Sequence, residues 1–155
     1  MMRTAIAITV VLIATISAVA QKKEPPPPPR FGIEADLEIY PQDTPQASLA
    51  SVLKAIDAKR FAYLAAHLSD AETVDKRVNE LGGKFESYVK LVTDRLSDDP
   101  EAVRQLRRFS SEGEFNVSGD AATVSHKEIK GRQVFLKKIG GRWFLEDRQK
   151  PAKEK

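Results

Sequence analysis

The side chains that could perform acid–base chemistry are few and widely spaced along the chain. They are Tyr63, His67, Asp70, Tyr88 and His126. Tyr63 and His67 are four residues apart, so they would share one face of a helix. A single histidine without a paired carboxylate is weak evidence for catalysis, because the partner sets the pKa and the orientation of the base. We therefore expect Tyr63 and His67 to lie near solvent at a helix boundary, with a general base at His67 as the alternative.

Four of these residues are also the candidates for lining a ligand pocket: Tyr63, His67, Tyr88 and His126. His126 ends a stretch of alternating apolar residues, which places it at the end of a strand as a boundary residue with satisfied hydrogen bonds. Asp70 is expected to belong to the start of a helix, where short polar side chains cap free amides. No residue is predicted to be catalytic.

Composition and motifs exclude several other classes of site. The chain has no cysteine, which excludes disulfides, thiolate chemistry and a lipidated cysteine. A metal centre needs three or four convergent ligands, and two histidines far apart do not supply them, so no metal or other cofactor is expected. Phosphate-binding glycine loops and nucleophile motifs are missing. The formal charge of +3 is too small to predict a specific nucleic-acid partner.

The first twenty residues have the parts of a secretory signal. A short basic start is followed by residues 4–20, which are uncharged and mostly apolar and end in Ala18-Val19-Ala20. Small residues of this kind precede signal-peptidase cleavage, so we predict a signal peptide over 1–20 and a periplasmic or secreted protein. The alternative is an uncleaved membrane anchor at 4–20, although a helix of that length spans only about 25 Å of a hydrocarbon core about 30 Å thick.

Three further segments follow the signal. Residues 21–43 are predicted to be a proline-rich linker and arm, because the unbroken Pro25–Pro29 run forms a stiff spacer and fits neither helix nor sheet. Within this segment, residues 31–40 alternate only in part and are expected to form a short strand or an ordered arm. A single domain is expected over 44–148, and a basic tail over 149–155.

Helices are predicted to occupy most of residues 44–110. Thr44-Pro45 and Asp99-Pro100 each combine a capping residue with a proline at the first helical position. Ser69 and Glu72 have the spacing of a capping box, which predicts Ser69 as the cap of another helix. Gly82-Gly83 interrupts the apolar periodicity and predicts either two helices or one kinked helix.

Strands are predicted for the rest of the domain. A turn at Gly119-Asp120 and a looser one around Lys130-Gly131 separate alternating segments, and Gly140-Gly141 closes a hairpin over residues 134–147. A two-residue loop there places Leu136 opposite Leu145 and Lys138 opposite Trp143, so that Trp143 lies on the buried face. Helices followed by an antiparallel meander indicate the α+β class, with N-terminal helices packed on a curved sheet built from C-terminal hairpins.

The second face of that hairpin carries Phe135, Ile139 and Phe144. A monomer would leave these side chains exposed unless the arm over residues 31–39 covers them, so the sequence predicts a homodimer that associates through its sheet. Residues 126–155 are rich in lysine and arginine. These cations are interpreted as a solvated strand face, with an anionic partner such as an acidic protein, a lipid headgroup or a cell-wall polymer as the alternative.

The order of these elements resembles a known superfamily. The helices starting at TPQASLASVLKAIDAKRFAYLAAHLSD and the strands with SGDAATVS and VFLKKIGGRWFLED resemble the nuclear-transport-factor-2-like (cystatin-like, SnoaL-like) superfamily, and in particular its exported bacterial members of unknown function. The resemblance covers residues 44–148 and implies a cone of helices around a curved sheet. Because residues 71–110 are longer and more helical than in a typical cone domain, the cavity is expected to be reduced or filled.

Two functions remain open at this point, since such folds host many activities. The first is an exported, non-enzymatic module that binds a partner or assembles with itself through its sheet. The alternative is a small-molecule-binding protein, or an isomerase- or dehydratase-like enzyme, that uses the cavity of the cone. A polar, open cavity beside Tyr63, His67 and Tyr88 would favour the second function, whereas side chains that fill this space would favour the first.

Overall fold

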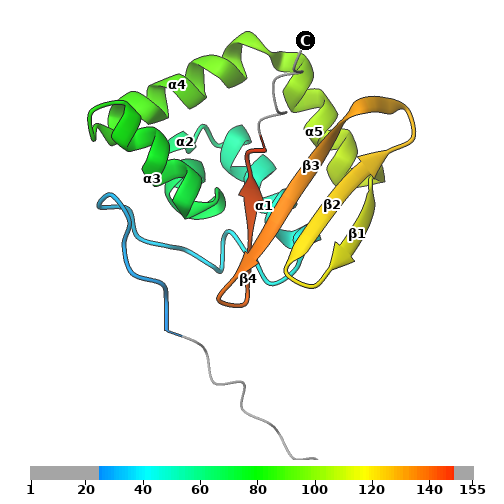
Figure 1. Cartoon of the computed structure of the whole chain (residues 1–155), viewed down its shortest axis with the longest axis horizontal. Helices are drawn as coiled ribbons and strands as arrows, with labels where there is room; N and C mark the ends of the chain where they lie inside the picture. Colours follow the sequence, from blue (N-terminus) through cyan, green and yellow to red (C-terminus); the bar gives the residue numbers. More distant parts are fainter. Residues whose placement is uncertain (1–24, 149–155) are drawn as a thin grey trace, which may run out of the picture.

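A computed structural model describes residues 25–148 of the 155-residue chain, and its helices precede its strands (Figure 1). The expected signal peptide over 1–20 and the tail over 149–155 lie outside the described residues. The helices are α1 (Pro45–Asp57), α2 (Phe61–Tyr63), the π-helix η1 (Leu64–Leu68), α3 (Ala71–Glu80), α4 (Phe85–Asp98) and α5 (Pro100–Glu112). The strands are β1 (Glu114–Ser118), β2 (Ala121–His126), β3 (Ile129–Ile139) and β4 (Arg142–Glu146). The predicted α+β class is confirmed.

Both cap–proline pairs start helices as predicted. The Thr44 hydroxyl accepts a hydrogen bond of 3.0 Å from the Ala47 amide at the start of α1. The Asp99 carboxylate accepts one of 2.9 Å from the Ala102 amide at the start of α5. Each cap satisfies an amide that has no partner within its helix.

The third helix starts one residue later than the capping-box pattern predicts. Asp70, not Ser69, is the cap of α3, because its carboxylate accepts hydrogen bonds from the amide and the hydroxyl of Thr73 at 3.2 and 2.8 Å. The Ser69 hydroxyl, just after the end of η1, instead donates a hydrogen bond of 3.0 Å to the carbonyl of Leu64, the first residue of η1. Gly82 and Gly83 both adopt positive φ, so α3 and α4 are two separate helices.

The four strands form one antiparallel sheet in the order β1-β2-β3-β4. Leu136 pairs with Leu145 and Lys138 with Trp143, as the hairpin spacing predicts. The turn before β3 differs from the prediction: it falls at residues 127–128, and Gly131 lies within β3 with φ 76°. Glycine tolerates positive φ inside a strand, so Gly131, which the sequence analysis assigned to a turn, instead allows a local irregularity within β3.

One face of the sheet packs against the helices. Trp143 is only 4% exposed and belongs to a core cluster with Leu49 of α1 and Phe109 of α5. The same cluster contains the inward-facing residues of β2 and β3, namely Ala122, Val124, Val134 and Leu136. This layer of helices over the sheet is the arrangement that the sequence predicted.

The arm before α1 packs on the helices and adds no strand to the sheet. The Nε2 atom of His67 donates a hydrogen bond of 2.7 Å to the Ile33 carbonyl. The Tyr63 hydroxyl accepts a hydrogen bond of 2.9 Å from the Asp36 amide. The Phe31 ring stacks on Phe85. Tyr63 and His67 are consequently 2% and 3% exposed, so the expectation that they lie near solvent was wrong.

Among the described residues, 25–148, no helix has the length and apolar character needed to cross a bilayer. The segment over 4–20, on which the anchor alternative depends, lies outside those residues.

Candidate functional site

A cleft of about 1050 Å³ opens between the helices and one end of the sheet. Its walls come from α1, η1, α4 and α5 on one side and from β2, β3 and β4 on the other. Residues of α4, α5 and the β2–β3 hairpin line it, and Figure 1 shows that the turn from α4 into α5 and the connection between β2 and β3 lie at the same end of the molecule. The expectation of a reduced or filled cavity was therefore wrong.

The α4 side of the cleft is only partly buried, although Val92 and Leu96 also contact a core cluster. Phe85 is the one residue of α4 that is fully buried, whereas Val92 and Leu96 are only half-buried and line the cleft. Apolar side chains that face a core normally close against it, since burial of apolar surface stabilises the fold. Here the same stripe leaves space in front of it.

The floor of the cleft is apolar. Its buried lining residues, His126 apart, carry aliphatic or aromatic side chains: Val52, Ile56, Leu64, Ala65, Phe109, Ile129 and Val134. Half-buried Leu106, Phe135 and Leu145 continue this surface toward the opening. Pockets of this size and character usually bury most of a drug-sized ligand.

The rim is charged and mainly basic. Its charged lining residues are four cations, Arg95, Lys130, Arg132 and Arg148, and two carboxylates, Glu146 and Asp147. The Arg148 guanidinium binds Glu146 at 3.0 Å and lies over the Phe135 ring at 4.5 Å, so these two charges largely offset each other. Arg132 donates 3.1 Å to the neutral Gln105 side chain.

Tyr88 and His126 are the two sequence-predicted pocket residues that line the cleft. Burial raises the pKa of the Tyr88 hydroxyl, and the nearby Asp147 carboxylate raises it further. The side chain therefore stays protonated at neutral pH and can donate a hydrogen bond. Tyr63 and His67 do not line the cleft, because they hold the N-terminal arm.

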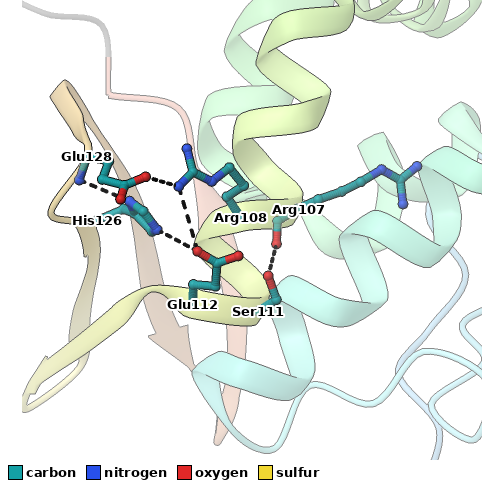
Figure 2. A network of polar contacts seen from close by, with 6 residues as sticks. All are labelled: Arg107, Arg108, Ser111, Glu112, His126 and Glu128. Carbon is teal, nitrogen blue, oxygen red and sulfur yellow. Dashed lines mark hydrogen bonds and ion pairs between the residues drawn. The ribbon is translucent and has the colours of Figure 1, made fainter.

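His126 belongs to a polar network that joins β2 to α5 (Figure 2). Its Nδ1 atom accepts a hydrogen bond of 3.1 Å from the Glu128 amide, so the ring proton is on Nε2. Nε2 lies 3.1 Å from the Glu112 carboxylate. Arg108 pairs with Glu128 and reaches Glu112 at 3.7 Å. The hydrogen bond from His126, with help from Arg108, lowers the pKa of the exposed Glu112 carboxyl. Both ring nitrogens of His126 are thus engaged within the chain.

This lining is chemically suited to binding. A general base needs a free lone pair directed at the substrate, and the ring nitrogens of His126 are already engaged. No group of three or more His, Asp or Glu residues that could hold a metal ion occurs in residues 25–148. The cleft offers apolar contact, a tyrosine donor and rim cations.

The three predicted interface residues on the other sheet face differ in accessibility. Phe144 is 9% exposed and lies beneath Arg142, whose guanidinium is 5.3 Å from the ring centre. Phe135 is half-buried and lines the cleft, whereas Ile139 is 43% exposed. The expected exposed surface is therefore much smaller than the alternation predicts, and dimerisation through the sheet stays a prediction.

Searches of protein-family models, curated proteins and solved structures find no match to this chain. The resemblance to the nuclear-transport-factor-2-like superfamily accordingly stays a prediction.

Apart from Tyr88 and His126, sequence reasoning missed the residues that form the cleft. It placed Val92, Leu96 and Leu106 only within the predicted helices over residues 44–110. It interpreted the cations of residues 126–155, which include Lys130 and Arg132, as a solvated strand face. One available signal was the apolar periodicity over residues 85–109, which predicts two more amphipathic helices after those of residues 44–81. One face of a single small sheet cannot pack closely against all of these helices, so some of their apolar side chains are left to line a cleft.

Proposed function

We propose that this protein is a binding module that takes a hydrophobic small molecule into the cleft. The observation that carries the proposal is the cleft of about 1050 Å³ with its buried apolar floor. Water in contact with such a surface is unfavourable, so a ligand that replaces it gains free energy in proportion to the apolar area buried. This function corresponds to the small-molecule-binding form of the alternative that the sequence left open.

Binding strength should depend on the length of the ligand's hydrocarbon chain. Each buried methylene contributes about 0.8 kcal/mol, so two additional carbons should tighten binding roughly tenfold until the cleft is full. Loss of translational freedom and ordering of side chains offset part of the total. We therefore expect affinities in the micromolar range for chains of moderate length.

We also propose that the protein is exported and acts outside the cytoplasm. The support is the sequence of residues 1–20, with its basic start, apolar stretch and Ala18-Val19-Ala20. The intact mass of the mature protein should then correspond to a chain that begins at Gln21. A mature form that retains Met1 and sediments with membranes would favour the anchored alternative.

The binding proposal is tested with a neutral fluorescent probe, N-phenyl-1-naphthylamine, whose emission rises in apolar surroundings. The natural protein should give a saturable increase in emission. Val92→Trp places a large ring in the cleft from α4 and should weaken probe binding at least tenfold. The control is Leu91→Trp, because Leu91 is the preceding residue of α4, is 43% exposed and is not among the residues that line the cleft.

Circular dichroism should show that both variants keep the helix content of the natural protein. Equal probe affinity in the two variants, or no saturable binding by the natural protein, would contradict the proposal.

A further inference from the structure

The arginines of α4 and α5 differ in whether they have an acidic partner. Arg104 pairs with Glu101 at 2.6 Å, Arg107 pairs with Asp57, and Arg108 pairs with Glu128. Arg95, which lines the cleft, forms no ion pair with any carboxylate in residues 25–148. The one arginine of α4 and α5 without an acidic partner among residues 25–148, Arg95, is therefore the one that lines the cleft.

The strand side of the mouth shows the same pattern. Lys130 and Arg132, near the start of β3, are exposed and line the cleft. Neither forms an ion pair with a carboxylate of the described residues, and the partner of Arg132 is the neutral Gln105. Arg148 is different, because it is neutralised by Glu146. Three cations from two sides of the opening are thus left to face a ligand.

The positions of these charges relative to the apolar floor indicate an amphipathic ligand. A group of cationic side chains at the exposed edge of an apolar cleft creates a positive electrostatic potential around the solvent-exposed end of a bound ligand. Tyr88 adds a neutral hydroxyl donor to the same lining. Asp147 is the remaining carboxylate of the rim, and it leaves the balance of charge positive.

We propose that the ligand is an amphipathic anion: a hydrocarbon chain held in the cleft, with a carboxylate or phosphate head bound by Arg95, Lys130 and Arg132. This inference rests on the proposed binding function and specifies the ligand class for that site. Guanidinium groups bind carboxylates and phosphates through paired hydrogen bonds, and the lysine adds a point charge. Because all three cations are exposed, their combined effect is expected to depend on salt.

The test is displacement of N-phenyl-1-naphthylamine by four ligands with the same dodecyl chain, each used below its micelle concentration. Laurate and dodecyl phosphate should displace the probe at about tenfold lower concentration than dodecanol, and dodecyltrimethylammonium should be the weakest. The preference for the anions should shrink as salt is raised to about 0.5 M. The tighter of the two anions identifies the head group.

Charge-removing variants then locate the head. Arg95→Gln, Lys130→Gln and Arg132→Gln should each weaken laurate binding about 2- to 5-fold and leave dodecanol binding unchanged. Arg104→Gln is the matched control, since Arg104 is an exposed arginine of α5 outside the cleft. It should affect neither ligand.

The possible results separate the two proposals. If dodecanol displaces the probe as well as laurate does, or if the variants weaken both ligands equally, the anionic head is refuted while the binding function stands. If the probe does not bind the natural protein, both proposals fail.

Discussion

A cluster of buried hydrogen bonds joins the segment before α1 to the edge strand β4. The structure indicates how much this cluster contributes to the free energy of unfolding. The Trp143 carbonyl accepts hydrogen bonds from Gln42 Nε2 at 2.8 Å and from Ser48 Oγ at 2.9 Å. Gln42 Nε2 also donates 3.0 Å to the His67 carbonyl. Gln42 and Ser48 are 3% and 0% exposed, so water cannot replace either donor without a rearrangement. We predict how Gln42→Leu, Ser48→Ala and the double variant change the free energy of unfolding.

Each single variant should have a moderate cost. Ser48→Ala leaves the Trp143 carbonyl with its second donor and should cost about 0.5–1.5 kcal/mol. Gln42→Leu leaves the buried His67 carbonyl without a donor, at about 1–3 kcal/mol. Gln42 Oε1 has no partner in the described residues, so leucine also removes an unsatisfied acceptor. This gain brings the expected cost of Gln42→Leu to about 1–2 kcal/mol.

The double variant should cost more than the sum of the two single variants. It removes both donors from the Trp143 carbonyl, which adds the penalty of a fully unsatisfied buried acceptor, about 1 kcal/mol or more. Urea unfolding followed by the emission of Trp143, the single tryptophan of the chain, gives the three free energies.

The control pair is Gln42→Leu with Thr93→Val. The Thr93 hydroxyl bonds to the Val89 carbonyl within α4 and shares no partner with Gln42, so these two should be additive within about 0.5 kcal/mol. Additivity of Gln42→Leu with Ser48→Ala would refute the view that the two side chains share one buried acceptor.

Two further predictions concern packing and pH. An added Cβ at Gly113 would collide with the Phe109 carbonyl oxygen and lie 2.6 Å from Val124 Cγ1, so Gly113→Ala should cost about 1–3 kcal/mol in urea unfolding, and an unchanged midpoint would contradict this. Burial lowers the pKa of His67 below its usual 6.5. As the pH falls, the histidine of the unfolded chain therefore binds a proton before that of the folded chain does. The free energy of unfolding should consequently decrease as the pH drops below about 6.5, and this decrease should stop below the lowered pKa of the folded state. His67→Gln can still donate to the Ile33 carbonyl and should remove that part of the pH dependence; identical pH profiles of the two proteins would refute it.

Much of the fold could be predicted from local sequence signals. Thr44-Pro45 and Asp99-Pro100 predicted helix starts correctly because capping depends on neighbouring residues. Gly140-Gly141 predicted the register of the last hairpin, since the two-residue turn fixes which residues pair. The cap at Asp70 differed from the prediction because Ser69 and Asp70 are both residue types that cap helices. The Ser69 hydroxyl bonds to the Leu64 carbonyl, which leaves Asp70 to cap α3.

The candidate site was less predictable because it depends on long-range packing. His67 was expected near solvent, since its own helix gives no sign that the arm with Ile33 covers it. The cleft depends on how closely α4 approaches the sheet, and the apolar positions of Val92 and Leu96 are the same whether that gap is closed or open. Arg95 gives no local signal either, because its lack of an acidic partner depends on residues from other elements.

The central claim is that a hydrophobic ligand occupies the cleft, and intermolecular NOEs between methyl groups and the ligand test it most directly. With the methyl groups of the natural protein labelled and dodecanol as the ligand, we predict contacts from the dodecyl chain to Leu106, Val134 and Leu145, which line the cleft from three elements. The exposed Ile139 and Val117 provide the comparison. Contacts confined to those two surface residues, or none to the cleft methyl groups at saturating ligand, would contradict the account.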